Sequence, residues 1–194
     1  MRTSTVSIEM GKVGLTKQQI RSKILLKLKT QKEENREKKS KIIKKKLLRT
    51  AESIKAKTVM FYISFDGEVN TKEMIKEAKR LGKIIAVPVC KGGKIKIIPC
   101  LLQNKARLKR GPYGAWEPAI KKPVHLENLD LVIVPGVAFD KQGNRLGRGK
   151  GCYDSFLKKL PDDVVSLGLA FDFQVLPSLP ATSTDVSVRK VIFA

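Results

Sequence analysis

Cysteine and histidine are scarce in this 194-residue sequence, and their scarcity excludes several classes of protein. The three cysteines, Cys90, Cys100 and Cys152, form no Cys-x-x-Cys pair and leave an odd thiol. A disulfide framework and a zinc site are therefore not expected, and a reducing cytoplasm is the natural compartment. The single histidine, His125, lies in a polar stretch, and we assign it no catalytic role.

Long hydrophobic runs are also missing. The longest apolar segments, around 84–90 and 131–134, have the length of strands, and the N-terminus lacks the apolar core of a signal peptide. We therefore expect a soluble, unprocessed protein without a membrane partner, and we expect it to act as a monomer. Residues 1–16 show no sustained periodicity and are predicted to form a mobile tail, which leaves 17–194 as a single domain.

Acidic residues are few, with 18 Asp and Glu against 40 Lys and Arg, so the formal net charge is +22. Such a surplus of positive charge favours anionic partners, which include nucleotides, polyglutamylated or phosphorylated metabolites and nucleic acid. Hydrophobic residues make up 42% of the chain, which is ordinary for a globular domain and excludes a disordered class.

The segment 17–57 holds more than half of the charge surplus, with sixteen Lys or Arg against four Glu. Its apolar residues recur at helical spacing in two stripes, one of Ile20, Ile24 and Leu28 and one of Ile43, Leu47, Ala51 and Ile54. We predict two amphipathic helices whose basic faces are mostly solvated. The segment also suggests an alternative function, a nucleic-acid-binding protein on a catalytically inactive α/β scaffold, although it has no aromatic residue and no recognised nucleic-acid motif.

A strand–helix–strand succession follows this segment. The β-branched and aromatic run 58–63 predicts a buried strand, 83–90 predicts a second, and helical spacing separates them. Two strands joined by one helix pair in parallel, and ligands bind at the C-terminal edge of such sheets. Glu68, shortly after the first strand, is therefore expected on the ligand-binding rim.

Further strands are predicted at 94–98, 129–134, 164–170 and 186–193, which gives a three-layer α/β/α sandwich around a mostly parallel sheet. Residues 101–128 are expected to be mainly loop. Within them, Tyr-Gly-Ala-Trp-Glu-Pro at 113–118 combines two aromatic residues with Gly and Pro around one acid. This segment is either a packed surface loop or a wall that stacks on a flat ligand through Trp116.

The stretch 135–154 has the most distinctive composition of the chain. In its glycine loop, which we define as 147–151 (Gly-Arg-Gly-Lys-Gly), the backbone can approach a ligand closely while Arg148 and Lys150 supply positive charge. Helical spacing begins directly after the glycines, and the unpaired N–H groups of a helix N-terminus bind phosphates. We predict an anion-binding loop, with a tight surface turn as the alternative. Asp154 either stabilises the helix dipole or binds the Mg²⁺ that accompanies a nucleotide.

Two standard phosphate motifs do not fit the glycine loop. A Walker P-loop requires Gly where Asn144 stands and Ser or Thr where Gly151 stands, and the dinucleotide fingerprint requires its third glycine where Cys152 stands. Neither motif therefore identifies the ligand of the glycine loop.

Residues 140–154, Asp-Lys-Gln-Gly-Asn-Arg-Leu-Gly-Arg-Gly-Lys-Gly-Cys-Tyr-Asp, closely resemble the signature loop of the 5-formyltetrahydrofolate cyclo-ligases, also called methenyltetrahydrofolate synthetases. The similarity covers nearly the whole chain, through 17–21, 64–68, the Tyr-Gly-x-x-Glu-Pro loop and 183–185. It implies a three-layer α/β fold related to sugar-phosphate isomerases and CoA transferases.

The resemblance also implies a reaction. Members of this family convert 5-formyltetrahydrofolate to 5,10-methenyltetrahydrofolate with ATP and Mg²⁺, and they release ADP and phosphate. The family mechanism phosphorylates the formyl oxygen, after which N10 attacks the activated group and phosphate departs as the new ring forms. Phosphoryl transfer of this kind depends on positioning and charge neutralisation, which suits a loop of glycines and cations.

By matching position, the resemblance makes Arg148 and Lys150 the catalytic residues and Asp154 the metal ligand. Contacts to ATP are implied for Lys17, Arg21, Arg145, Leu146, Gly147, Arg148, Gly149, Lys150, Gly151, Cys152 and Tyr153. Contacts to the folate are implied for Ile63, Glu68, Trp116, Arg148, Gly149, Lys150, Gly151 and Cys152.

The sequence departs from the family pattern at two positions. Cys152 stands where a second Tyr is frequent, and we interpret it as a spacer rather than a nucleophile. Arg189 stands where an acid commonly serves as a second metal ligand, and a guanidinium cannot coordinate Mg²⁺. Three hypotheses stay open: Asp154 holds the metal with water and phosphates, Arg189 replaces one charge of the metal, or Asp185 is a further ligand.

Overall fold

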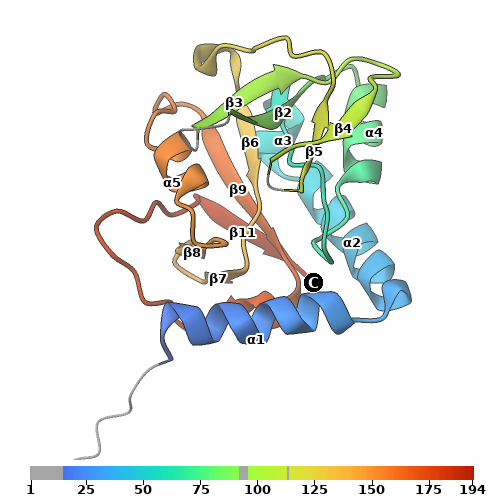
Figure 1. Cartoon of the computed structure of the whole chain (residues 1–194). Coiled ribbons are helices and arrows are strands. Elements are labelled where there is room, and N and C mark those ends of the chain that lie inside the picture. The colour runs from blue at the N-terminus through green and yellow to red at the C-terminus, as the bar shows by residue number, and fades with distance from the viewer. Residues whose placement is uncertain (1–14, 92–95, 113) are drawn as a thin grey trace, which may run out of the picture.

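The computed structural model describes residues 15–91, 96–112 and 114–194, and a six-stranded sheet forms its centre (Figure 1). The strand order is β11-β9-β6-β1-β2-β3; β2 and β3 pair antiparallel, and all other neighbours pair parallel. These strands are β1 (Thr58–Met60), β2 (Ile84–Lys91), β3 (Lys96–Leu101), β6 (Leu131–Val134), β9 (Val165–Ala170) and β11 (Lys190–Phe193). The predicted mostly parallel sheet is confirmed.

Helices cover the sheet on both faces. They are α1 (Lys17–Thr30), α2 (Glu33–Leu48), α3 (Ala51–Lys55), α4 (Lys72–Arg80), α5 (Cys152–Leu157) and the short 3₁₀ turns η1 (Leu126–Asn128) and η2 (Asp172–Gln174). No described helix has the length and apolar character that a membrane span requires.

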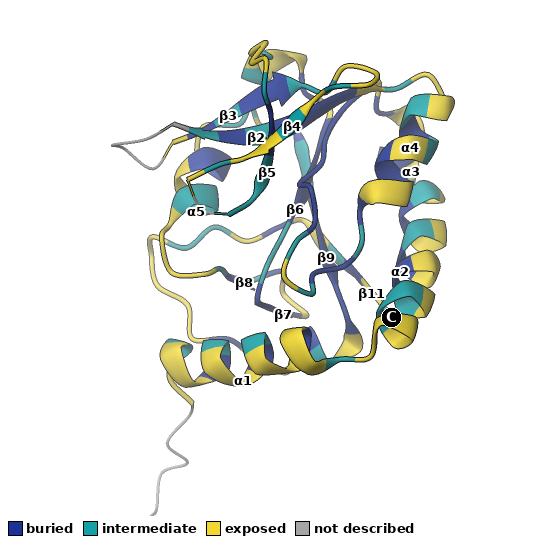
Figure 2. Ribbon diagram, turned by 45° about the vertical axis from the view of Figure 1, so that its right-hand side comes forward, coloured by how far each residue is buried: buried dark blue, intermediate teal, exposed yellow. Residues whose placement is uncertain are grey.

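Alternation along the strands creates two hydrophobic cores. Val59 of β1 packs in the core that includes α1, α2 and α4, whereas its neighbour Met60 packs in the core that includes α5. Leu131 and Val132 of β6 divide in the same way, because successive side chains of a strand point to opposite faces. The strands are mainly buried, while the outer surfaces of α1 and α2 are exposed (Figure 2). The three-layer arrangement follows from these two cores.

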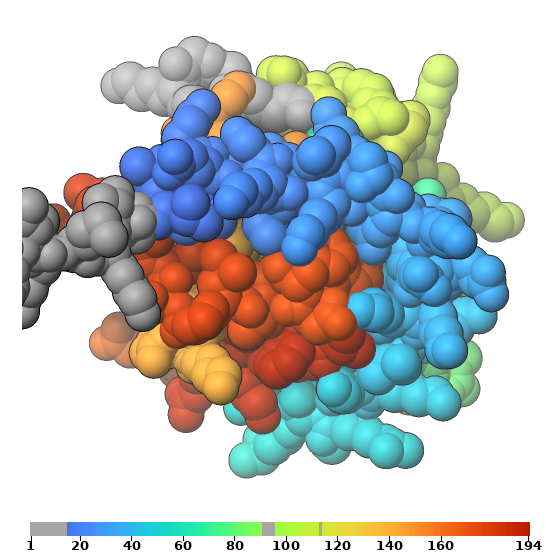
Figure 3. Space-filling view, turned by 90° about the horizontal axis from the view of Figure 1, so that it is seen from below, coloured from blue at the N-terminus to red at the C-terminus, as the bar shows by residue number. Residues whose placement is uncertain are grey.

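Helix α1 forms where the first apolar stripe predicted it. The Thr16 side chain accepts a hydrogen bond from the Gln19 backbone, and the Gln19 side chain caps Thr16 in return. Ile20, Ile24 and Leu28 are all buried, so the stripe faces the core. Thr16 therefore belongs to the helix start rather than to the predicted tail over 1–16, most of which lies outside the described residues. Seen from below, α1 lies beside the segment around η2 (Figure 3).

The prediction that the second apolar stripe faces the core was right for only two of its four residues. Ile43 and Leu47 are buried in α2, but Ala51 and Ile54 are exposed. The helix ends at Leu48, and a new one starts because the Thr50 hydroxyl accepts the Ser53 N–H at 3.1 Å. This break rotates the following residues away from the core.

Small sheets occur where loops were predicted. β7 (Ala138–Asp140) and β8 (Arg145–Leu146) form a hairpin inside the stretch 135–154, and β10 (Val175–Leu176) pairs with β7. β4 (Leu108–Arg110) and β5 (Trp116–Pro118) pair within 101–128. The strand predicted at 186–193 is shorter in the structure, because only its last part, β11 (Lys190–Phe193), pairs with β9. Residues 92–95, which include the start of the strand predicted at 94–98, and residue 113 lie outside the described residues.

Candidate active site

A cavity of about 680 Å³ lies at the C-terminal edge of the parallel strands. The glycine loop forms one side, and a turn that follows β1, Ser64–Glu68, contributes to the other; we call this turn the acidic turn. Every residue for which the resemblance implies a contact to ATP, folate or the metal lines this one cavity: Lys17, Arg21, Ile63, Glu68, Trp116, Arg145, Leu146, Gly147, Arg148, Gly149, Lys150, Gly151, Cys152, Tyr153 and Asp154. Segments separated by more than 100 residues therefore meet at one place.

The glycine loop has the backbone that its composition predicts. Gly149 has φ +97° and Gly151 has φ +63°, a left-handed conformation that disfavours other residues. Gly151 is also the N-cap of α5, and no side chain caps the start of that helix. The loop thus brings a helix N-terminus and unobstructed backbone to the cavity wall.

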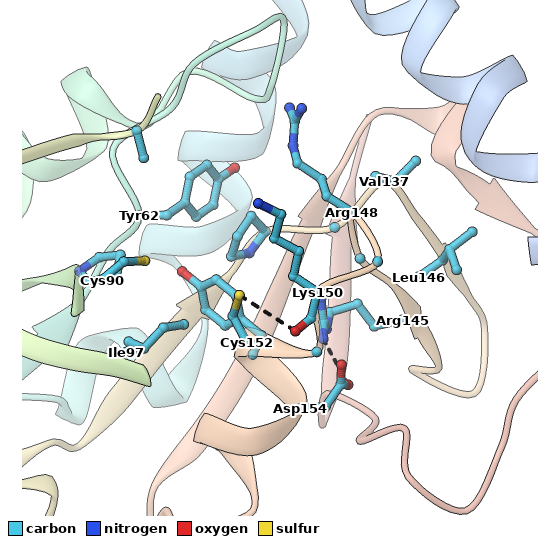
Figure 4. A pocket seen from close by; sticks show the side chains of 18 of the residues that line it. Tyr62, Cys90, Ile97, Val137, Arg145, Leu146, Arg148, Lys150, Cys152 and Asp154 are labelled. Atoms are coloured by element: carbon cyan, nitrogen blue, oxygen red, sulfur yellow. Dashed lines mark hydrogen bonds and ion pairs between the residues drawn. The ribbon is translucent and has the colours of Figure 1, made fainter. Parts of the chain in front are cut away.

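Arg145 and Asp154 form a buried ion pair at one end of the cavity (Figure 4). Arg145 Nη2 lies 2.9 Å from Asp154 Oδ1, and the side chain of Arg145 is only 3% exposed. Asp154 Oδ1 also accepts the Val186 N–H at 3.2 Å. Two buried polar atoms nearby, Arg145 Nε and the Tyr153 hydroxyl, have no hydrogen-bond partner among the described residues, as expected of atoms that bind a ligand.

Arg148 crosses from the glycine loop to the acidic turn. Its guanidinium lies 3.0 Å from Asp66 Oδ2 and 3.5 Å from Glu68 Oε1, and it stacks over the Phe65 ring at 4.6 Å from the centroid. In Figure 4, Arg148 and Lys150 extend away from the Arg145–Asp154 pair. The glycine loop therefore presents two cations to the space between the walls, whereas Arg145, in β8 before the loop, pairs with Asp154.

Glu68 is the acid with the most perturbed environment in the cavity. Burial raises the pKa of Glu68 to about 7, although Arg148 and the Phe65 N–H, which donates to Glu68 Oε2, lower it. A carboxyl group with this pKa can hold or release a proton near neutral pH.

Helix α1 contributes two cations to the cavity. Lys17 Nζ lies 2.5 Å from Asp185 Oδ2, which joins the start of α1 to the loop before β11. Arg21 Nε donates to the Gly147 carbonyl at 2.9 Å and so holds the glycine loop. Two basic residues of the segment 17–57 therefore stabilise the fold through these contacts and also contribute positive charge to the cavity.

Comparison with known proteins decides the family. A sequence model described as the 5-formyltetrahydrofolate cyclo-ligase family matches residues 13–194. The chain belongs to this family. A 5-formyltetrahydrofolate cyclo-ligase of Haemophilus influenzae is 33% identical over 149 residues, 75% of this chain and 80% of that protein. The mouse protein of the same name is 27% identical over 192 residues, 93% of this chain and 95% of its own.

Solved structures of the family share the fold. The NMR structure of 5,10-methenyltetrahydrofolate synthetase from Aquifex aeolicus has a TM-score of 0.80 and 33% identity, and the match covers 92% of this chain and 90% of that one. A structure of the Mycoplasma pneumoniae 5,10-methenyltetrahydrofolate synthetase has a TM-score of 0.75 at 22% identity, covers 92% of this chain and 98% of that one, and supports the fold alone. None of these findings favours the nucleic-acid alternative.

The residues around Asp154 allow a metal only with help from a ligand. Within the described residues no group of three or more His, Cys, Asp or Glu side chains could hold a metal ion. Mg²⁺ commonly binds one or two carboxylates and completes its coordination shell with phosphate oxygens and water. Asp154 can supply the one carboxylate that this arrangement needs. Asp185 is held by Lys17 and by the Thr182 N–H at 2.7 Å. Arg189 is exposed and is not among the residues that line the cavity, so its position does not support the hypothesis that its guanidinium replaces a metal charge.

The cysteines of the cavity are poor nucleophiles. Burial raises the pKa of Cys90 to about 11 and also raises the pKa of Cys152, so both thiols stay protonated near neutral pH. This agrees with the interpretation of Cys152 as a spacer.

Sequence reasoning missed several residues that line the cavity, chiefly Tyr62, Phe65, Cys90 and Glu117. Glu117 is 2% exposed and accepts the Cys90 N–H at 2.8 Å, so it joins β5 to β2. The dense Tyr-Gly-Ala-Trp-Glu-Pro composition was the available signal for this wall. For Cys90 no local signal existed, because it lies within a strand of ordinary composition.

Proposed function

We propose that this protein converts 5-formyltetrahydrofolate to 5,10-methenyltetrahydrofolate with ATP, and that it releases ADP and phosphate. The observation that carries the proposal is the single cavity in which the glycine loop, the start of α1 and the acidic turn meet. A phosphoryl donor and a folate can lie side by side there, one along the loop and one against the turn.

The nucleotide phosphates would bind along the glycine loop and the start of α5. The loop offers backbone N–H groups without side-chain obstruction, and Lys17, Arg21 and Arg145 surround this end with positive charge. Asp154 would hold Mg²⁺ together with phosphate oxygens, and the metal would neutralise charge on the transferred phosphate. Asp154 also orients Arg145 through their ion pair.

The folate would lie between Trp116, Ile63 and Glu68, with its formyl group toward Arg148 and Lys150. The formyl oxygen attacks the terminal phosphorus and ADP departs; N10 then attacks the formyl carbon, loses its proton, and phosphate leaves. Arg148 and Lys150 would stabilise the charge that develops on the transferred phosphoryl group. Trp116, half-buried beside Arg110, offers a ring surface to a flat ligand.

A second hollow of about 620 Å³ adjoins the cavity and shares Leu28, Phe65 and Trp116 with it. Lys29 and Lys72 line this hollow, and within the described residues their ammonium groups have no ion-pair partner. An anionic glutamate tail of the folate would reach these lysines. We expect a triglutamate substrate to show a several-fold lower KM than the monoglutamate, and we expect added salt to reduce this difference.

The direct test of the function mixes purified protein with 5-formyltetrahydrofolate, ATP and Mg²⁺ and follows the absorbance of methenyltetrahydrofolate. Product and ADP should appear in equal amounts, and product formation should need both ATP and the metal. Absence of product at saturating substrates would reject the proposed function.

A further inference from the structure

The acidic turn is held by α1, by its C-cap residue Gln31 and by α2, from which Arg36 donates to the Glu68 carbonyl at 2.9 Å. Asp66 has φ +51° and Gly67 has φ +79°, so two successive residues are left-handed. A Cβ atom on Gly67 would lie 2.0 Å from the Leu28 carbonyl oxygen, and Gln31 Nε2 donates to the Gly67 carbonyl at 2.8 Å. Asp and Asn tolerate the left-handed conformation better than most residues, so the turn restricts what can stand at position 66.

The backbone of Arg148 is fixed from the other side. Arg148 stands between Gly147 and Gly149, and Arg21 of α1 holds the Gly147 carbonyl. Helix α1 thus contacts the glycine loop near its start and the acidic turn near its end. The position of the long Arg148 side chain across the gap depends on what it meets at the turn.

The Arg148 guanidinium makes three contacts with the acidic turn, and their distances differ. The Asp66 carboxylate lies at 3.0 Å, whereas the Glu68 carboxylate lies at 3.5 Å, and the Phe65 ring packs against the guanidinium. Asp66 is the closer acid, although Glu68 is the more deeply buried one. The contact with Asp66 therefore keeps Arg148 from closing fully on Glu68.

We propose that Asp66 is a positioning residue that holds the Arg148 guanidinium across the cavity and limits its pairing with Glu68. The proposal rests on the proposed function, in which Arg148 stabilises the transferred phosphoryl group. An Arg side chain has many rotamers, and a fixed partner keeps it in the geometry that the reaction needs. Without Asp66, Arg148 moves onto Glu68 and away from the space between the two substrates.

The pKa of Glu68 should respond to this movement of Arg148. The charged and titratable groups that act on the Glu68 carboxyl are Arg148, Asp66, Tyr62 and Tyr153, while Arg36 donates to the Glu68 backbone carbonyl at 2.9 Å. Loss of Asp66 removes a negative neighbour and allows Arg148 to approach, and both changes favour ionised Glu68. The pKa of Glu68 should therefore fall in a variant that lacks the Asp66 charge.

The test uses Asp66→Asn in the full-length protein, because Asn keeps the size and the left-handed backbone while it removes the charge. We expect kcat to fall about tenfold, while the KM values for ATP and 5-formyltetrahydrofolate change by less than about twofold. Carboxyl NMR titration should show a lower pKa for Glu68 in the variant than in the wild type. In an Arg148→Gln background, Asp66→Asn should change kcat by less than about twofold, because there is no guanidinium left to hold.

Glu77→Gln is the matched control, since it removes the acid of an ion pair with Arg80 on the surface of α4, and it should leave kcat and the Glu68 titration unchanged. Wild-type kcat together with an unshifted Glu68 in Asp66→Asn would overturn the proposal while the proposed function stands. If the wild type itself forms no product, the proposed function fails, and the Glu68 titration alone then decides whether Asp66 positions Arg148.

Discussion

Two arginines three residues apart, Arg145 and Arg148, end in opposite environments. The side chain of Arg145 is 3% exposed and pairs with one acid, Asp154, at 2.9 Å. The side chain of Arg148 is 37% exposed and is shared between Asp66 and Glu68 at 3.0 and 3.5 Å. The first lies in a strand of the small hairpin and the second in the glycine loop, so one is embedded in the fold and the other crosses open space. The difference separates a cation that stabilises the site from one that is available to a reacting group.

The largest effect should come from breaking the buried pair. Arg145→Leu leaves Asp154 without its cation in a largely buried place, so we expect the free energy of unfolding to fall by about 3 kcal/mol. Urea denaturation followed by circular dichroism measures this change. A double variant, Arg145→Leu with Asp154→Leu, should recover part of the loss, and failure to recover any would show that the pair is not the cause.

Glu68→Gln should separate stability from activity at the other arginine. Because the folded pKa of Glu68 is raised to about 7, its contribution to stability is full below the unfolded pKa of about 4.3 and is lost as the pH rises through 7. The neutral Gln side chain avoids this loss, so at pH 8 we expect the variant to be more stable by about 2 kcal/mol, with the two proteins converging at pH 4. Turnover should fall despite the added stability. Equal stability at both pH values would contradict the raised pKa.

Arg148→Ala and Lys150→Ala should each lower turnover at least tenfold, which corresponds to about 1.4 kcal/mol of transition-state stabilisation, and leave the urea midpoint nearly unchanged. Steady-state assays and denaturation of the same preparations give both quantities. Wild-type turnover in both variants would show that the glycine loop does not face the reacting groups.

The smallest effect is expected for the partly exposed pair of Lys17 and Asp185. Asp185→Asn should lower the free energy of unfolding by less than about 1 kcal/mol, because solvent screens the pair. It should raise the KM for ATP a few-fold if Asp185 orients Lys17 toward the nucleotide. Lys39, whose exposed pair with Asp172 lies outside the cavity, is the matched control: Lys39→Met should leave the KM for ATP unchanged.

Local patterns in the chain predicted the elements that depend on neighbouring residues. The stripe of Ile20, Ile24 and Leu28 identified α1, and the β-branched runs identified the central strands, because burial of one face dictates the period of apolar residues. The dense glycines of 147–151 predicted a loop that opens onto the cavity, since left-handed backbone needs glycine. Glu68 was placed on the rim by its position after a strand, and it lines the cavity.

Other features had no local signal because their partners are distant in the chain. The helix break at Thr50 exposes Ala51 and Ile54, and the hairpin of β7 and β8 depends on pairing with β10. Asp66 meets Arg148 across 82 residues, and Asp185 meets Lys17 across 168. Such contacts depend on how the elements pack, which no spacing rule within one segment reports.

The sequence by itself determined the order of the central strands and of α1, the surplus of positive charge, the glycine loop and the family that the loop resembles. These properties follow from composition and short-range periodicity, which act before the chain is packed. The tertiary structure alone decided that the buried Arg145 pairs with Asp154 while Arg148 spans the cavity to Asp66 and Glu68. Burial and distance set the strength of the interaction between two charges. For Arg148 both are fixed only once α1 has brought the acidic turn and the glycine loop together.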